Sequence, residues 1–189
     1  MGIIIFGASG AGSTTLGKEI AEQLVFQYLD IDDYLWCWET KIPLTVTRSN
    51  DERTKLLMND IMKYPNFVIA GTIFSNQKLF EHLFDLAIFV STPAKVCAER
   101  VRAREITRWG QRVLPGGDMY KITRFHGDYN DYIANAQKYE TADVSKFGRK
   151  LHTKWASELP CPVLDVDGTK NILENADWII KQYRNLSNE

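Results

Sequence analysis

The chain has 189 residues, of which 44% are hydrophobic and 25% are charged. This length and composition predict one ordinary domain with a full core, residues 1–189, and exclude a low-complexity or fibrous chain. The 23 basic and 24 acidic residues leave a formal net charge of −1, so no overall field favours nucleic acid or a membrane as partner. The opening apolar run is too short for a signal peptide, and no stretch reaches the length of a membrane span. We therefore expect a cytoplasmic protein.

Short apolar segments alternate with helical patterns along the chain. In chain order they predict strand Gly2–Phe6, helix Thr14–Val25, strand Phe26–Ile31, helix Asp51–Tyr64, strand Phe67–Gly71, helix Ser75–Leu83, strand Leu86–Val90, helices Pro93–Trp109, Met119–Lys138 and Thr141–Leu159, strand Val163–Val166 and helix Asn171–Asn185. This alternation is typical of an α/β fold in which helices cover both faces of a parallel sheet. Ligands of such folds bind at the carboxyl ends of the strands.

The segment after the first strand is a glycine-rich loop in the register G-x-x-x-x-G-K-[ST], with Ser13 at the lysine position and Thr14 at the hydroxyl position. Its glycines let successive N–H groups point into one concavity, and the following helix adds its positive N-terminal end. We therefore expect phosphate to bind here even without the lysine, and Thr14 to ligate Mg²⁺. The residues that would surround the phosphates are Gly7, Ala8, Ser9, Gly10, Ala11, Gly12, Ser13, Thr14 and Thr15.

Two alternatives remain for this loop. A dinucleotide-binding fold is supported by the position of Asp30 or Asp32, about where a ribose-binding acid would lie. The other alternative is a tight turn without any ligand.

Carboxylates follow the second predicted strand. Alternate residues of a strand share a face, so Asp30 and Asp32 are expected to point the same way. Asp32 would orient a magnesium-bound water or accept a proton from a hydroxyl substrate, with Asp33 beside it at the substrate. The alternative is that Asp32 or Asp33 only caps the following turn.

Arginines recur every fourth residue through Arg100, Arg104, Arg108 and Arg112, which places them along one stripe of a helix for about two turns. Such a stripe is tolerated when phosphates lie between the cations. Arg104 and Arg108 are the candidates for catalysis, because they adjoin a lid segment at about residues 108–118. A solvated helix face with salt bridges is the alternative.

Further candidates lie on loops. Arg48 belongs to a segment of aromatic and basic residues that precedes a helix, and we assign it to the substrate. Gly71 and Thr72 end the third strand and would approach the substrate through the backbone. His82, His126 and His152 have no metal-ligand spacing, and we interpret them as surface or packing residues.

With these residues in view, the chain resembles the nucleoside-monophosphate-kinase and shikimate/gluconate-kinase group of P-loop proteins. It is especially similar to bacterial adenylate-kinase-like proteins whose loop has Ser or Thr instead of lysine. The resemblance rests on the loop and on four further segments that run through most of the chain: residues 30–36, 100–112, 115–119 and 159–163.

The resemblance implies a three-layer α/β/α fold with a five-stranded parallel sheet, ATP as donor, Mg²⁺ and a closing lid. It further implies that the loop holds the donor phosphates, that Arg104 and Arg108 are lid arginines, and that residues 165–169 border the adenine. The chain departs from adenylate kinases at Gly71, which has Phe74 rather than arginine three residues on, so AMP is not supported as acceptor.

The sequence therefore predicts a P-loop phosphotransferase that moves the γ-phosphoryl group of ATP to a small metabolite or nucleotide. Its partners would be the nucleotide and the small-molecule acceptor, with no nucleic acid and no membrane. Two other functions stay open: a nucleotide-binding protein with little or no turnover, suggested by Ser13, and an NAD(P)-binding protein.

Overall fold

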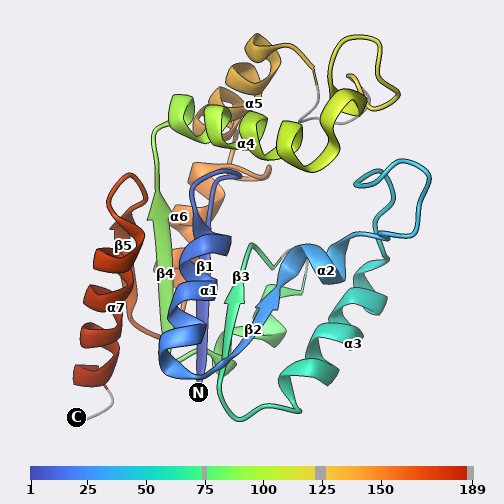
Figure 1. Ribbon diagram of the computed structural model, residues 1–189. Coiled ribbons are helices and arrows are strands. Elements are labelled where there is room, and N and C mark those ends of the chain that lie inside the picture. The colour runs from blue at the N-terminus through green and yellow to red at the C-terminus, as the bar shows by residue number, and fades with distance from the viewer. Residues whose placement is uncertain (74–75, 122–126, 187–189) are drawn as a thin grey trace.

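The centre of the molecule is a five-stranded parallel sheet (Figure 1). The structure is a computed structural model that describes residues 1–73, 76–121 and 127–186. The sheet has the order β2-β3-β1-β4-β5, and every neighbouring pair is parallel. Its strands are β1 (Gly2–Gly7), β2 (Gln27–Asp30), β3 (Phe67–Ala70), β4 (Leu86–Ser91) and β5 (Val163–Asp167).

Helices form a layer on each face of the sheet. They are α1 (Ser13–Leu24), α2 (Ile31–Leu35), α3 (Asn50–Ile61), α4 (Ala94–Trp109), α5 (Tyr129–Thr141), α6 (Arg149–Glu158) and α7 (Ile172–Leu186). Three short 3₁₀ turns cover Gln77–Leu79, Glu81–Leu83 and Gly110–Val113. The five-stranded three-layer α/β/α fold expected from the sequence is confirmed.

The alternation of β1 explains the two layers. Ile3 and Ile5 are fully buried in a cluster with residues of α1 and α7. Ile4 and Phe6 point to the other face and pack with residues of α3 and α6. Because both faces of the strand are covered, its sequence is an unbroken apolar run rather than an alternating one.

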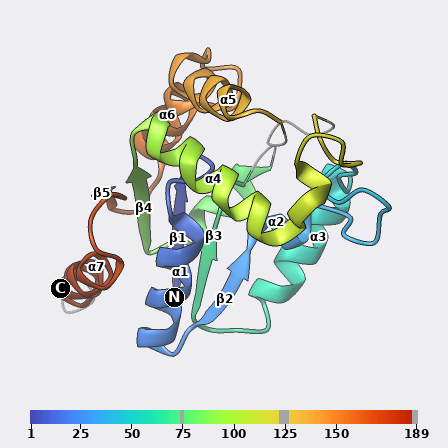
Figure 2. The same ribbon diagram turned by 45° about the horizontal axis from the view of Figure 1, so that its top comes forward.

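The strand order excludes the dinucleotide-binding alternative. In that fold the first strand lies beside the second, whereas here β3 lies between β2 and β1. The carboxyl ends of β1, β2 and β3 meet at one edge of the sheet, and α4 and α5 lie beyond this edge (Figures 1 and 2). This is the edge at which parallel α/β proteins bind their ligands.

Several predicted helices are shorter in the structure. The expected helix over Ser75–Leu83 is two 3₁₀ turns, with residues 74–75 outside the described residues. The amides of Phe80 and Leu83 donate to the third preceding carbonyl, and this tighter winding buries Phe80 in the core below α3.

The predicted helix Thr141–Leu159 is helical only in its second half, α6. α5 ends at Thr141 and α6 begins at Arg149, and turns and bends within residues 142–148 separate the two helices. A Cβ atom at Gly148 would lie 2.6 Å from the Cβ of Ala142, so only glycine permits this close turn. The predicted helix Met119–Lys138 begins only at Tyr129, and its residues 122–126 lie outside the described residues.

In the described part of the chain, no helix combines the length and apolarity that crossing a bilayer requires.

Candidate functional site

The glycine-rich loop links β1 to α1 and has the backbone that its glycines predict. Gly10 and Gly12 both adopt positive φ angles, 87° and 110°, which only glycine adopts readily. A Cβ atom at Gly10 would lie 2.4 Å from the carbonyl oxygen of Cys97 at the start of α4. α1 begins at Ser13, so the first amides of the helix face the loop. The loop therefore combines a tight curl with a helix N-terminus, as a phosphate cradle requires.

Side chains hold this loop by its carbonyl groups. The Arg100 guanidinium donates from Nη1 to the carbonyls of Ala11 (3.2 Å) and Gly168 (3.0 Å). The Thr92 hydroxyl donates to the same Ala11 oxygen at 3.0 Å. Because these contacts engage the carbonyls, they fix the loop without occupying its amides. Arg100 thus supports the loop from outside, a role that the arginine spacing does not reveal.

The carboxylates after β2 are arranged differently from the prediction. β2 ends at Asp30, and Asp32 and Asp33 belong to the short helix α2 rather than to the strand. The Asp30 side chain caps that helix by accepting the Asp32 amide at 3.1 Å. The shared-face argument for Asp30 and Asp32 is therefore wrong, because the chain turns into a helix at Ile31. Asp30 takes the capping role that the sequence analysis assigned to Asp32 or Asp33.

Asp32 nevertheless reaches the same place as two arginines of α4. Its carboxylate accepts the Trp36 indole N–H at 3.2 Å. Although the side chain is open to solvent, surrounding protein atoms raise its pKa by desolvation, and the charge of Asp30 raises it further. The positive charges of Arg104 and Arg108 act in the opposite direction and are therefore near the carboxylate. The charges of Arg104 and Arg108 thus act on Asp32, and the catalytic roles of these three residues stay predictions.

The position of Arg104 is fixed by a buried carboxylate. Its Nε donates at 3.0 Å to Glu105, which is completely buried, and the other Glu105 oxygen accepts the Trp109 indole N–H at 2.8 Å. The Arg108 guanidinium lies 6.0 Å from the centre of the Trp109 ring. Trp109 and Glu105 therefore order the end of α4 that carries both arginines.

The lid segment, residues 108–118, contacts the loop between α2 and α3. Arg112 forms two 3.0 Å hydrogen bonds to the Asp118 carboxylate within the lid segment. Its Nη2 also donates to the Lys41 carbonyl at 3.1 Å. In Figure 2 these two loops approach each other on the far side of α2 from β1. Arg112 therefore joins two arms of the molecule rather than continuing the α4 stripe.

Thr14 lies near the acidic end of β2. The Tyr28 hydroxyl donates to Asp30 at 3.0 Å and also interacts with the Thr14 side chain. Burial, followed by the charge of Asp30, raises the Tyr28 pKa. Thr14 itself is exposed at the start of α1. An exposed hydroxyl with carboxylates nearby fits Mg²⁺, which usually keeps its waters and substrate phosphates and takes only one or two protein ligands. Among the described residues, no group of three or more His, Cys, Asp or Glu side chains is placed to hold a metal ion.

Arg48 makes contacts that stabilise α2. Its Nη1 donates to the carbonyls of Asp33, Tyr34 and Trp36 at 2.8, 3.1 and 2.7 Å. This guanidinium therefore closes the C-terminal end of α2. Its assignment to a substrate, like that of Asp33, stays a prediction.

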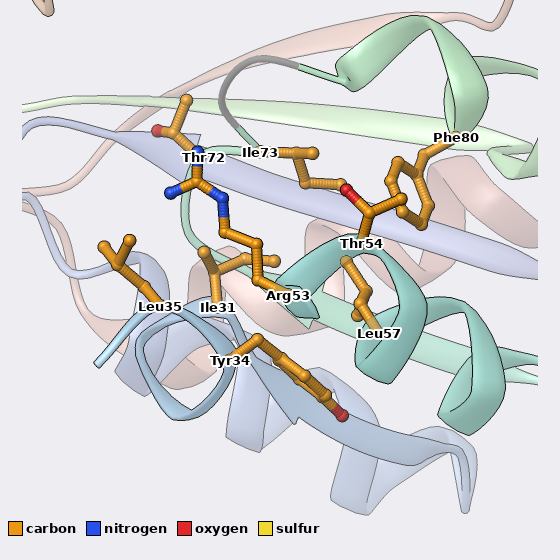
Figure 3. Close-up of a pocket in the computed structure, with 9 residues that line it drawn as sticks. All are labelled: Ile31, Tyr34, Leu35, Arg53, Thr54, Leu57, Thr72, Ile73 and Phe80. Atoms are coloured by element: carbon orange, nitrogen blue, oxygen red, sulfur yellow. The ribbon is translucent and has the colours of Figure 1, made fainter. Parts of the chain in front are cut away.

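A small pocket of about 30 Å³ opens between α2, α3 and the end of β3 (Figure 3). Gly71 has a φ of 114°, and a Cβ atom there would lie 2.8 Å from Ile31, so the glycine lets α2 approach β3. Thr72 follows at the pocket wall. Figure 3 shows the Arg53 guanidinium extending toward the Thr72 end of the pocket. The lining residues are Ile31, Tyr34, Leu35, Arg53, Thr54, Leu57, Thr72, Ile73 and Phe80.

The sequence placed Arg53 among the aromatic and basic residues that a substrate could meet, and it gave His152 no role in a site. Arg53 is one arginine on a polar helix, and only the fold brings it opposite Thr72. His152 is fully buried and its ring contacts Thr72, 80 positions away in sequence. No local sequence pattern predicts that either residue lies near Thr72.

The fold identifies a class of protein. A shikimate kinase from Acinetobacter baumannii, solved with shikimate, superposes with a TM-score of 0.56 at 16% identity, over 100% of this chain and 94% of that one. A deoxyadenosine kinase from M. mycoides with bound dATP gives 0.54 at 14% identity, over 97% and 100%. A gluconokinase from Sinorhizobium meliloti gives 0.51 at 16% identity, over 98% and 95%. The chain has the fold of P-loop kinases.

The sequence comparison gives the family itself. The uncharacterized protein YqaC of Bacillus subtilis (strain 168) is 32% identical over 178 residues, which cover 94% of each protein. The chain belongs to the same family as YqaC. No protein-family model matches it.

Proposed function

We propose that this protein is a phosphotransferase that moves the γ-phosphoryl group of ATP to a hydroxyl or phosphate of a small molecule. The observation that carries the proposal is the tightly curled glycine-rich loop at the N-terminus of α1, with the charges of Arg104 and Arg108 acting on Asp32 at the same edge of the sheet. A phosphoryl transfer needs an anion cradle, a proton acceptor and cations at the transferred group, and little covalent chemistry from the protein.

The loop amides from Gly7 to Thr15 would bind the polyphosphate, and the clamp from Arg100 keeps them preorganised. Thr14 would hold Mg²⁺, with Asp32 orienting a water bound to the ion, and the ion would supply positive charge at the phosphates. Asp32 would accept the proton of an acceptor hydroxyl, and its raised pKa makes it a stronger base than an ordinary aspartate. Arg104 and Arg108 would offset the charge that develops on the transferred group.

The pocket lined by Arg53 and Thr72 is the place for the acceptor. It lies beside α2, which carries Asp32, and its mixed apolar and cationic lining suits a small molecule with polar groups. The lid segment would close above it and exclude water.

The test combines two measurements on the same preparation. Calorimetry measures ATP binding with and without Mg²⁺, and a coupled assay follows ADP release with shikimate, gluconate and deoxyadenosine as first acceptors. We expect ATP binding that needs Mg²⁺, and ADP release that one acceptor stimulates. Stronger stabilisation by NADP than by ATP in a thermal-shift screen would contradict the proposal.

Ser13 favours a second candidate, a protein that binds ATP with little turnover. The lysine that it replaces normally bridges the β- and γ-phosphates, and the loss of one such contact costs about 3 kcal/mol, or roughly a hundredfold in rate. Tight ATP binding without ADP release for any acceptor would support this candidate over the kinase.

Ser13→Lys distinguishes the two further. We expect it to tighten ATP binding about tenfold, because it adds a cation beside the phosphates. Ser157→Lys adds the same charge at an exposed position of α6 and serves as the matched control. Unchanged affinity in Ser13→Lys would mean that Arg104 or Arg108 already occupies the space of the lysine.

A further inference from the structure

A buried chain of hydrogen bonds runs from the acceptor pocket into the core. The Thr72 hydroxyl, at the pocket wall, lies 2.8 Å from Nε2 of His152. The other ring nitrogen of His152, Nδ1, lies 2.7 Å from the Tyr139 hydroxyl. His152 has no exposed surface, and the rings of Phe6, Phe89 and Phe147 surround it edge-on.

These surroundings keep His152 neutral. Burial lowers the pKa of its imidazole to about 4, and the positive charge of Arg149 lowers it further. At neutral pH the ring therefore carries a single hydrogen. One of its nitrogens must donate and the other must accept.

Tyr139 decides which nitrogen accepts. Within the described residues, the only hydrogen-bond partner of its hydroxyl is His152 Nδ1. A buried phenol whose hydrogen has no acceptor is costly, so this hydroxyl must donate to Nδ1. Burial raises the pKa of the Tyr139 phenol, so the hydroxyl keeps its hydrogen at neutral pH and can donate it to Nδ1. The ring hydrogen of His152 is then on Nε2, which donates to the Thr72 oxygen.

This order leaves the hydrogen of Thr72 for the pocket. Its oxygen already accepts from His152, and the part of the chain that the structure describes gives the hydroxyl no second partner. We propose that Tyr139 and His152 fix the Thr72 hydroxyl as a hydrogen-bond donor, so that the pocket takes ligands with a carboxylate or hydroxyl oxygen at this point. The inference rests on the proposed function only in taking this pocket as the acceptor site.

Thr72 would thus touch the ligand, whereas His152 and Tyr139 are positioning residues that act through it. If these two hydrogen bonds ran in the opposite direction, Thr72 would donate to His152 and would offer only lone pairs to the pocket. The same side chain would then select hydrogen-bond donors instead of acceptors. The direction of two buried hydrogen bonds therefore sets which chemical group the pocket prefers.

The direction can be measured without any ligand. In the full chain labelled with ¹⁵N-histidine, long-range ¹H–¹⁵N spectra distinguish the two neutral tautomers. We expect His152 to be the Nε2–H tautomer and to stay neutral from about pH 5.5 to pH 8. His152→Gln identifies the His152 signal by its loss. If that variant does not fold, Tyr139→Phe identifies the same signal by its change in chemical shift. An Nδ1–H tautomer or an imidazolium would overturn the inference.

Kinetics with an acceptor from the panel test the consequence. Thr72→Val is expected to raise the KM for the acceptor about tenfold and Tyr139→Phe about threefold, with the KM for ATP within twofold of wild type. Thr72→Ser should restore acceptor binding. Tyr132→Phe, also buried on α5, is the matched control and should change neither constant.

An unchanged acceptor KM in Thr72→Val would overturn the inference while leaving the proposed function intact. If no acceptor of the panel stimulates ADP release, the result counts against the proposed function. The tautomer of His152 would still decide the direction of the hydrogen bonds from Tyr139 to Thr72.

Discussion

At Asp32, the requirements of catalysis and of stability conflict. Its pKa is raised, first by desolvation and then by the negative charge of Asp30, so the folded protein favours its protonated form. The ionised carboxylate is nonetheless the form that could accept a proton from a substrate. The same surroundings that make Asp32 a good base therefore cost the fold stability at neutral pH.

Asp32→Asn is expected to lower kcat at least about a hundredfold, because it removes the proton acceptor, while ATP affinity stays within about threefold. The same variant should have a higher melting temperature than the wild type at about pH 8. The unfolded chain has an ordinary aspartate pKa, so the penalty is complete above the raised folded pKa and vanishes below the unfolded one. As pH falls from the first value to the second, the two melting temperatures should converge.

The measurements are steady-state kinetics and thermal unfolding across pH. Asp177→Asn, at an exposed position of α7, removes one carboxylate elsewhere and should leave both properties unchanged. A wild-type kcat in Asp32→Asn would remove Asp32 from the mechanism. A lower melting temperature at pH 8 would show that attraction to Arg104 and Arg108 outweighs the desolvation.

At the level of elements, α1 ends on an unusual residue. Val25 caps the helix with φ 57° and ψ 42°, a left-handed conformation that disfavours β-branched side chains. Its side chain is 90% exposed and so contributes almost no packing to offset this strain. We expect Val25→Gly to raise the free energy of unfolding by about 1 kcal/mol.

Denaturant unfolding measures this change, and Val25→Ala is the matched control. Alanine keeps the Cβ atom that clashes in the left-handed region, so it should recover less than half of the gain. A less stable Val25→Gly protein would mean that glycine's freedom in the unfolded chain outweighs the strain.

The contact between α4 and the glycine-rich loop gives a third prediction. Arg100→Ala is expected to weaken ATP binding about tenfold and to lower the melting temperature, since two carbonyls lose a charged donor. Arg102→Ala removes an exposed arginine of the same helix and should change neither quantity. Calorimetry and thermal unfolding together measure both effects. ATP affinity equal to wild type in Arg100→Ala would show that the loop keeps its shape without the clamp.

The elements that the sequence predicted well are those whose signals are local. β1, the glycine-rich loop and the start of α1 follow one another within 15 residues, so apolar run, glycines and helical pattern identify them together. The central strands β1, β3 and β4 are buried and likewise carry their own apolar signal, whereas β2 and β5 at the edges of the sheet are only partly buried. The turn of the chain into α2 at Ile31 was missed, because an apolar residue between aspartates fits a strand as well as a short helix.

The acceptor side of the site depends on contacts between distant segments. Thr72 meets His152, and Gly71 admits Ile31, only because β3 lies between β2 and β1. Strand order is a property of the whole sheet, and a single sequence does not encode it in any local pattern. The donor side could therefore be read from residues 7–15, whereas the acceptor side required the fold.

At the scale of the whole molecule, two arms face each other across the site. One is the lid segment, residues 108–118, and the other is the loop between α2 and α3. Arg112 joins them through the Asp118 carboxylate on one side and the Lys41 carbonyl on the other. Both partners of the ion pair are substantially exposed, so solvent screens their attraction and the pair is weak. We expect such a contact to open and re-form in solution.

Arg112→Ala is expected to raise amide hydrogen exchange by a small factor, about two- to fivefold, in both arms, because the loss of a weak, solvent-screened contact increases the open population only modestly. Exchange in β1 and α1 should not change, since neither contacts Arg112. Asp118→Asn breaks the ion pair but spares the bond to Lys41, so it should loosen the lid segment more than the loop between α2 and α3. Arg184→Ala, exposed on α7, is the charge control. Equal exchange of residues 36–49 in Arg112→Ala and wild type would mean that the two arms move independently of this side chain.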